Sequence, residues 1–183
     1  MASAPAPPLL LASTSPRRRE ILEQLRIPFD IVAPHYDETE EDPVAHALGK
    51  ARSVLAEADG RPVLGCDTEV ILDGHVFGKP ADEGEARTFL ERLSGRTHEV
   101  YGGLVLRRDG EEQTGLCVTK VRFRLLEGGE IGAYLATGEW RDRAGGYAIQ
   151  GRGAALVESI DGDFWNVVGL PVPELVRMLK NPC

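Results

Sequence analysis

PPLLLASTSPRRREILEQLRIPF, residues 7–29, predicts a short apolar strand, a tight Ser/Thr turn and a helix. The strand is expected at residues 9–12, and the helix is expected to begin at Pro16 and end near Arg26. Ser15 followed by Pro16 is typical of a helix start, because serine caps the first N–H groups and proline has its φ already set. A strand that leads directly into a helix indicates an α/β fold.

Three consecutive arginines, Arg17, Arg18 and Arg19, stand in the first turn of that helix. A helix N-terminus carries about half a positive charge, so each cation there costs roughly 0.3–1 kcal/mol unless an anion lies close. Helical spacing places Arg17 and Arg18 beside the inward face, where free N–H groups and the hydroxyls of Ser13 and Ser15 complete a site for a triphosphate. The alternative is pairing with surface acids, which we expect for Arg19 because Glu23 lies four residues further on.

Composition places the chain among ordinary globular proteins of one domain. Its 183 residues are 42% hydrophobic and 27% charged, which is enough to bury a core. A net charge of -8 and a pI near 5.1 argue against nucleic acid or an anionic membrane as a partner. No apolar run approaches transmembrane length. An acidic surface with a basic pocket favours a small anionic ligand.

The cysteines and histidines show no spacing typical of metal ligands. The cysteines are odd in number and form no CxxC pair, so neither a disulfide framework nor a zinc site is supported. We therefore expect a reducing compartment, the cytoplasm, and histidines that are solvated or lie in loops. These residues are Cys66, Cys117 and Cys183, and His35, His46, His75 and His98.

Strand-like and helix-like segments alternate along the chain and predict one α/β domain over residues 9–181, built on a mixed sheet. MASAPAPP, residues 1–8, lacks a cationic start and a long apolar run, so we expect a disordered lead-in rather than a signal peptide. Asp73-Gly74 and Asp109-Gly110 are strong hairpin signals. The other expected elements are strands at 29–33, 63–72 and 155–160, and helices at 43–58, 82–93, 129–137 and 173–180.

Polar residues interrupt the apolar strand expected at 63–72. In extended backbone Asp67 and Glu69 share one face and Thr68 lies on the other. An ionised carboxylate buried there costs several kcal/mol unless a cation compensates it, so the pair forms a candidate half-site for magnesium. The alternative is that Asp67 only caps the following turn.

The acid-rich stretch HYDETEEDP, residues 35–43, offers a third carboxylate for that metal. Asp37 and Glu38 are the leading candidates. The later acids, residues 40–42, are typical of a solvated charge run.

Two lysines and one glutamine add candidate contacts to a phosphorylated ligand. Lys79 lies in FGKP, where Gly78 and Pro80 fix a loop suited to a point charge aimed at phosphate. Lys50 lies mid-helix and on spacing alone resembles a surface lysine. Gln150 closes GGYAIQ, where an amide can present a donor and an acceptor to a nucleobase edge. GxxxxGK[ST] and GxGxxG phosphate loops do not occur in the sequence.

The ordered motifs of the whole chain resemble the Maf family of nucleoside triphosphate pyrophosphatases. The match runs from about residue 10 to residue 179, and its specificity comes from the joint order of the motifs. They are LASTSPRRREIL, YDE, KA, GCDTEVILDG, GKP, RLSGRTHEV, TKVRF, GGYAIQGRG and IDGDFWNVVGLP.

The resemblance implies a fold of the inosine-triphosphatase-like class, an elongated mixed sheet flanked by helices with a deep central groove, and often a homodimer. It implies hydrolysis of a nucleoside triphosphate between the α and β phosphates, giving monophosphate and pyrophosphate, with a divalent metal such as Mg²⁺ or Mn²⁺. The family's association with septum formation supplies an alternative, a non-catalytic nucleotide-binding regulator of cell division. A phosphatase of small metabolites is a further alternative.

The resemblance also implies roles for individual residues. Arg17, Thr68 and Gln150 match the group that acts on dTTP and UTP, whereas the 7-methyl-GTP group has Trp at the first of these positions. The phosphate-binding residues are Ser13, Arg17, Arg18, Lys50 and Lys79, the acidic-loop residue is Glu38, and the general base is Asp67.

These roles fit the chemistry of phosphoryl transfer. The arginines, the lysines and the metal would neutralise the triphosphate, while Asp67 orients and deprotonates the attacking water. Glu38 and Asp67 would hold the metal, with Glu69 as a further candidate. Cys66 stands beside Asp67, and a reactive thiol there would make activity sensitive to oxidation.

Overall fold

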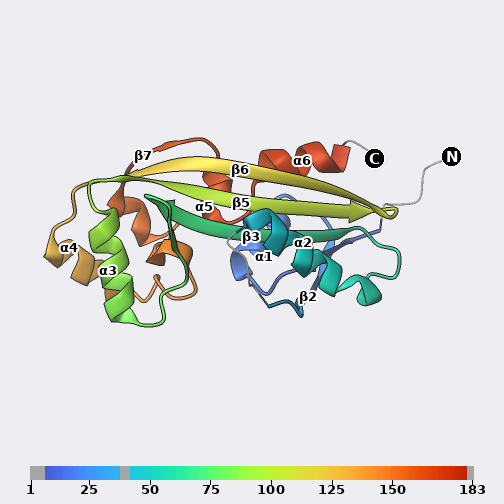
Figure 1. Ribbon diagram of the computed structural model, residues 1–183, viewed down its shortest axis with the longest axis horizontal. Coiled ribbons are helices and arrows are strands. Elements are labelled where there is room, and N and C mark those ends of the chain that lie inside the picture. Colours follow the sequence, from blue (N-terminus) through green and yellow to red (C-terminus); the bar gives the residue numbers. More distant parts are fainter. Residues whose placement is uncertain (1–6, 38–41, 181–183) are drawn as a thin grey trace. The chain divides into compact units, whose positions relative to one another are not determined.

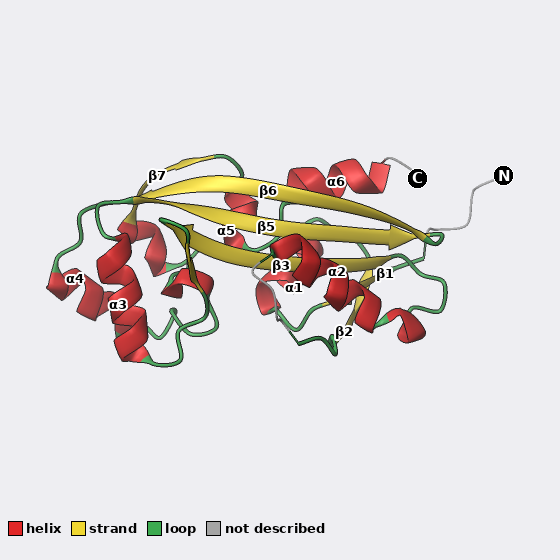
Figure 2. Cartoon of the chain, viewed as in Figure 1, coloured by secondary structure: helices red, strands yellow, loops and turns green. Residues whose placement is uncertain are grey.

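The computed structural model describes residues 7–37 and 42–180 (Figure 1). Strands and helices alternate along most of this chain (Figure 2). The strands are β1 (Leu9–Ala12), β2 (Phe29–Val32), β3 (Val63–Leu72), β4 (His75–Phe77), β5 (Thr97–Arg108), β6 (Glu111–Phe123) and β7 (Val157–Asp161). The helices are α1 (Pro16–Gln24), α2 (Pro43–Ser53), α3 (Glu83–Leu93), α4 (Gly128–Leu135), α5 (Phe164–Val168) and α6 (Val172–Lys180), with short 3₁₀ turns at Leu55–Glu57, Ala144–Gly146 and Arg152–Leu156.

The strands form one mixed seven-stranded sheet, which confirms the expected α/β class. Its order is β2-β1-β3-β5-β6-β7, and β4 pairs with β3 off this path. β1 runs parallel to both β2 and β3, whereas β4 and β7 are antiparallel to their partners. None of the helices in the described ranges is long and apolar enough to cross a membrane.

The chain forms two compact parts. The first holds the residues up to Asp67, Gly103–Leu116 and the residues from Gly169 onward, and the second holds Thr68–Gly102 and Cys117–Val168. The division falls inside strands that continue from one part into the other, as in β3 between Asp67 and Thr68. The expected lead-in at residues 1–8 lies mostly outside the described residues.

Helix α1 confirms the opening prediction with two corrections. It begins at Pro16 as expected but ends at Gln24, because Arg26 adopts a left-handed φ of 54° that stops the helix. Ser15 occupies the N-cap position, yet its side chain makes no capping bond within the described residues. Its backbone N–H instead donates to Ser13 Oγ over 3.1 Å. The turn is therefore held by Ser13.

Helix α2 packs closely against β3 in the first part. A Cβ on Gly65 would overlap the carbonyl oxygen of Ala47, so only glycine permits this approach. Asp42, expected in a solvated charge run, is exposed and also caps the helix by accepting from the N–H of Val44 over 2.8 Å. The core beneath α2 contains Leu10, Ala12, Ala47, Ala51, Val54, Ala58, Val63 and Val105.

Both hairpin signals are confirmed. Leu72 pairs with His75 across Asp73-Gly74, and β5 meets β6 across Asp109-Gly110. Asp109 and Gly110 have φ values of 53° and 87°, the left-handed region that tight hairpin turns require.

Two of the histidines overturn the expectation that all four are solvated or in loops. His46 is 5% exposed in α2, and His98 is 1% exposed in β5. His98 lies in an aromatic cluster of the second part, where its Nε2 is 2.8 Å from Tyr147 Oη and its ring packs edge-on against Phe123. Periodicity could not separate these residues from solvated histidines, because burial depends on which strand or helix covers them.

Burial lowers the pKa of His98 from 6.5 to about 4 and makes stability pH-dependent. Because the fold favours the neutral ring, the unfolded chain takes up its proton first as the pH falls. Stability is therefore lost between pH 6.5 and 4, by up to about 3 kcal/mol. Denaturant unfolding across this range should show a smaller loss in His98→Gln than in the wild type. His75→Gln, at an exposed position, should retain the wild-type slope, and equal slopes in all three proteins would contradict the assignment.

Candidate functional site

Arg18 turns inward from α1 and binds the loop that precedes the helix. Its side chain is buried, with 9% of the residue exposed. Nη1 donates to Ser13 Oγ over 3.1 Å, and Nε donates to the backbone carbonyl of Gly169 over 2.9 Å. Gly169 lies just before α6, 151 positions away in sequence. This guanidinium therefore fixes the Ser13 turn against a distant segment of the first part.

The three arginines have three different environments. Arg17 is half-buried, whereas Arg19 is exposed and binds Glu23 Oε1 over 2.9 Å, as predicted. Arg18 donates to the hydroxyl oxygen of Ser13 and to the backbone carbonyl of Gly169. The inward orientation expected of Arg18 is thus present, and its role in binding phosphate stays a prediction.

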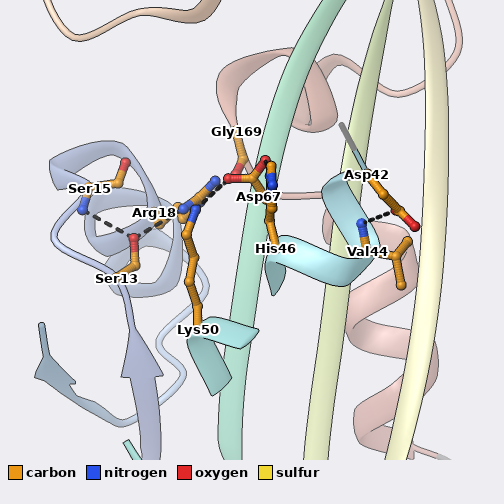
Figure 3. Close-up of polar contacts among 9 residues, drawn as sticks. All are labelled: Ser13, Ser15, Arg18, Asp42, Val44, His46, Lys50, Asp67 and Gly169. Atoms are coloured by element: carbon orange, nitrogen blue, oxygen red, sulfur yellow. Dashed lines mark hydrogen bonds and ion pairs between the residues drawn. The ribbon is translucent and has the colours of Figure 1, made fainter. Parts of the chain in front are cut away.

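Asp67 receives two side chains from α2 (Figure 3). Lys50 Nζ donates to Asp67 Oδ1 over 2.5 Å, and His46 Nδ1 lies 3.4 Å from Asp67 Oδ2. All three residues are buried, at 9%, 5% and 8% exposure for Lys50, His46 and Asp67. Helical spacing explains the arrangement, because residues four apart lie on one face of a helix. Lys50 is therefore part of the site and is not the surface lysine that its spacing suggested.

The position of Asp67 in the middle of β3 overturns the idea that it caps a turn. β3 continues from Val63 to Leu72 without a break, so Asp67 and Glu69 project from the same strand face. Glu69 is 7% exposed. Two carboxylates buried on one strand face need compensating cations, and Lys50 supplies one of them.

The donor set at this point fits a divalent metal. One ligand atom each from His46, Asp67 and Glu69 lies within 4.8 Å of the other two. Carboxylate oxygens suit Mg²⁺ and Mn²⁺, and an imidazole nitrogen suits transition metals. Glu38, the metal ligand expected from the acidic loop, lies outside the described residues. Asp37, the other candidate there, is exposed.

The environment of Cys66 disfavours oxidation, contrary to the expectation of an oxidation-sensitive thiol. Its side chain is fully buried, and burial raises the pKa of the thiol to about 11, although Arg18 and Lys50 offset part of that rise. Oxidation needs the thiolate and access to solvent, and Cys66 has neither. The positive charges of Arg18 and Lys50 lower the pKa of this thiol, whereas the negative charge of Asp67 raises it. Figure 3 shows the three side chains pointing toward one another.

The remaining predicted residues belong to the second part. Thr68 follows Asp67 in β3 and is half-buried on the opposite face. Lys79 is exposed in the loop after β4, and Gln150 is exposed in the turn before the 3₁₀ segment Arg152–Leu156. Glu139 holds that turn by accepting from the backbone N–H of Arg152 over 2.8 Å. The described contacts of Asp67 thus come from His46 and Lys50. Those of the Ser13 turn come from Arg18, which also binds the Gly169 carbonyl.

His46 and the Gly169 carbonyl are the site groups that sequence reasoning missed. Spacing did carry a signal for His46, because it stands four residues before Lys50. A backbone carbonyl has no signature in the sequence, so the contact to Gly169 could not have been found.

Comparison with protein families gives one match that covers nearly the whole chain. The model described as "Maf-like protein" matches residues 8–182. The chain belongs to the Maf family. This confirms the resemblance inferred from the ordered motifs.

Curated relatives in the Maf family carry the name dTTP/UTP pyrophosphatase. One from Symbiobacterium thermophilum is 50% identical over 93% of this chain and 92% of its own length. One from Thermococcus onnurineus is 46% identical over 94% of this chain and 96% of its own length. One from Deinococcus radiodurans is 43% identical over 98% of this chain and 95% of its own length.

Proposed function

We propose that this Maf family protein hydrolyses a nucleoside triphosphate, dTTP or UTP, to the nucleoside monophosphate and pyrophosphate. The observation that carries the proposal is a buried carboxylate, Asp67, held by Lys50, with the side chain of a second cation, Arg18, close by in Figure 3. The relatives named dTTP/UTP pyrophosphatase support the same reaction. A carboxylate among cations suits attack on a polyanion, because the cations offset phosphate charge while the carboxylate binds water.

Arg17, Arg18 and Lys50 bind the phosphates. The guanidinium fork of Arg18 is already oriented by Ser13 and the Gly169 carbonyl, so little side-chain entropy is lost when an anion binds. The N-terminal N–H groups of α1 add hydrogen-bond donors beside it. Lys79 contributes a further cation from the loop after β4.

Asp67 positions the attacking water and takes its proton. The water oxygen bonds to the α-phosphorus, the bond from that phosphorus to the α–β bridging oxygen breaks, and pyrophosphate leaves with the bond's electron pair. Lys50 keeps the carboxylate oriented through Oδ1, which leaves Oδ2 facing His46. A base must lie within hydrogen-bond reach of the proton that it removes, and a fixed rotamer favours this geometry.

A divalent metal held by Asp67, with Glu69 as a further ligand, completes the site. Glu38, predicted from the sequence as the other metal ligand, lies outside the described residues. When bound, such a metal neutralises phosphate charge and polarises the phosphoryl oxygens. Arg17, Thr68 and Gln150 select a pyrimidine base, as the family resemblance implies. A homodimer and a cytoplasmic location stay predictions.

A panel of nucleoside triphosphates tests the proposed reaction. With Mg²⁺ or Mn²⁺ present, dTTP and UTP should yield equimolar monophosphate and pyrophosphate, resolved by anion-exchange chromatography. We expect kcat/KM for ATP and GTP to be at least about tenfold lower, because a missing base contact costs roughly 1.4 kcal/mol or more.

Two outcomes would contradict this reaction. Release of inorganic phosphate from sugar phosphates in place of pyrophosphate would indicate a metabolite phosphatase. Nucleotide binding with no product under either metal would indicate a regulator of cell division. The names of the curated relatives do not favour either alternative.

A further inference from the structure

We propose that His46 supplies an imidazole ligand to the metal beside Asp67, which makes the site selective for first-row transition metals over Mg²⁺. The inference rests on the proposed function, which places a divalent metal at Asp67. It goes further by naming a ligand and a metal class that carboxylates alone would not select.

The position of His46 is set by α2. Asp42 caps the helix, and Gly65 lets it approach β3, so the face that carries His46 and Lys50 meets Asp67. Lys50 takes Oδ1 of the carboxylate, and the imidazole lies nearer Oδ2. Lys50 and His46, which lie on one helix face, therefore contact different oxygens of the same carboxylate.

The distances fit shared coordination better than a hydrogen bond. His46 Nδ1 lies 3.4 Å from Asp67 Oδ2, which is longer than the usual N–H···O range of about 2.7–3.2 Å. Two ligands each about 2.1 Å from one metal lie roughly 3–4.2 Å apart. The ligand atoms of His46, Asp67 and Glu69 all lie within 4.8 Å of one another. A small adjustment of side chains brings them to coordination distance.

Burial adds a second argument. His46, Asp67 and Glu69 are 5%, 8% and 7% exposed, so the group is a closed set of donors rather than an acidic surface patch. The ring of Tyr36 packs edge-on against the imidazole, with ring centroids 6.1 Å apart, and the buried position of His46 leaves the imidazole little free space. A ligand with restricted rotation loses less entropy when it binds a metal.

The mixed donor set decides which metals bind well. Mg²⁺ prefers oxygen ligands and releases its water reluctantly, so an imidazole adds little to its binding. Transition metals accept nitrogen, and their affinity rises along the series from Mn²⁺ to Cu²⁺. We therefore expect Mn²⁺, the weakest binder of that series, still to bind more tightly than Mg²⁺.

Metal binding to the full-length protein, without nucleotide, tests the inference. The signal of free Mn²⁺ in electron paramagnetic resonance gives the Mn²⁺ affinity, and displacement of bound Mn²⁺ by added Mg²⁺ gives the Mg²⁺ affinity. Pulsed measurements on the bound Mn²⁺ then detect coupling to an imidazole ¹⁴N. The wild type should bind Mn²⁺ at least about tenfold more tightly than Mg²⁺ and show the ¹⁴N coupling.

His46→Asn separates ligation from packing, because its amide places a polar atom near the position of Nδ1. We expect its Mn²⁺ affinity to fall at least about tenfold, its Mg²⁺ affinity to change by less than about threefold, and the ¹⁴N coupling to vanish. His75→Asn, at an exposed histidine in β4, is the matched control and should behave as the wild type.

A wild-type spectrum without ¹⁴N coupling would overturn the inference, whether or not the variant folds. Unchanged Mn²⁺ affinity in folded His46→Asn would overturn it as well. Pyrophosphate release without imidazole coupling would refute this inference and leave the proposed function intact. Coupling in a protein that releases no pyrophosphate would refute the proposed function alone.

Discussion

Asp67→Asn lowers pyrophosphate release by about 10²–10⁴-fold while the protein stays folded. The asparagine keeps an oxygen that can accept from Lys50 Nζ, so the contact between α2 and β3 survives. It cannot take a proton from water, because an amide is not a base at neutral pH. The measurement is kcat by a coupled pyrophosphate assay, with far-UV circular dichroism to confirm the fold.

Glu91→Gln is the matched control for Asp67→Asn. Glu91 is an exposed acid of α3, and its neutralisation removes the same charge from the chain. The control should retain the wild-type kcat. A folded Asp67→Asn protein with wild-type turnover would exclude Asp67 as the base.

Lys50→Met destabilises the protein by about 3–5 kcal/mol, because it leaves the buried Asp67 carboxylate without its 2.5 Å ion-pair partner. In a chain of this length that loss corresponds to roughly 6–20 °C in Tm. Both side chains of the pair are 11% exposed, so solvent screening is weak. Differential scanning calorimetry in the presence of EDTA measures the effect apart from metal binding.

The double variant Lys50→Met, Asp67→Asn should lose less unfolding free energy than the two single variants lose in total. We expect the difference to be at least about 1 kcal/mol. Removing the second charge relieves the burial cost that the first substitution created. Lys120→Met, at an exposed lysine of β6, should stay within about 0.5 kcal/mol of the wild type. Strict additivity in the double variant would show that the pair is not coupled.

Local sequence chemistry predicted much of the fold. Pro16 set the start of α1, and the dipeptides Asp73-Gly74 and Asp109-Gly110 fixed two hairpins, because these residues bias their own backbone angles. The pairing of Arg19 with Glu23 followed from helical spacing in the same way. The end of α1 was less well predicted, since the left-handed φ of Arg26 depends on the chain that follows.

For the candidate site, the sequence likewise predicted the residues but not all of their environments. The residue types and the order of the motifs identified the family and marked Asp67, Lys50 and Arg18 before any contact was known. The inward orientation of Arg18 was predicted, but the burial of Lys50 and of Cys66 was not. Lys50 had the spacing of a surface residue, and Cys66 had the sequence position of a reactive thiol, yet both are buried.

By itself the sequence determined the α/β class, the charged turn of α1 and the family to which the chain belongs, because these depend on neighbouring residues or on the order of motifs. Only the tertiary structure decided that Lys50 and His46 meet Asp67 across 17 and 21 positions, and that Arg18 reaches Gly169 across 151. The contacts of Lys50 and His46 with Asp67 form because α2 packs closely on β3 at Gly65. That packing is a property of surfaces brought together by folding, and no local propensity encodes it.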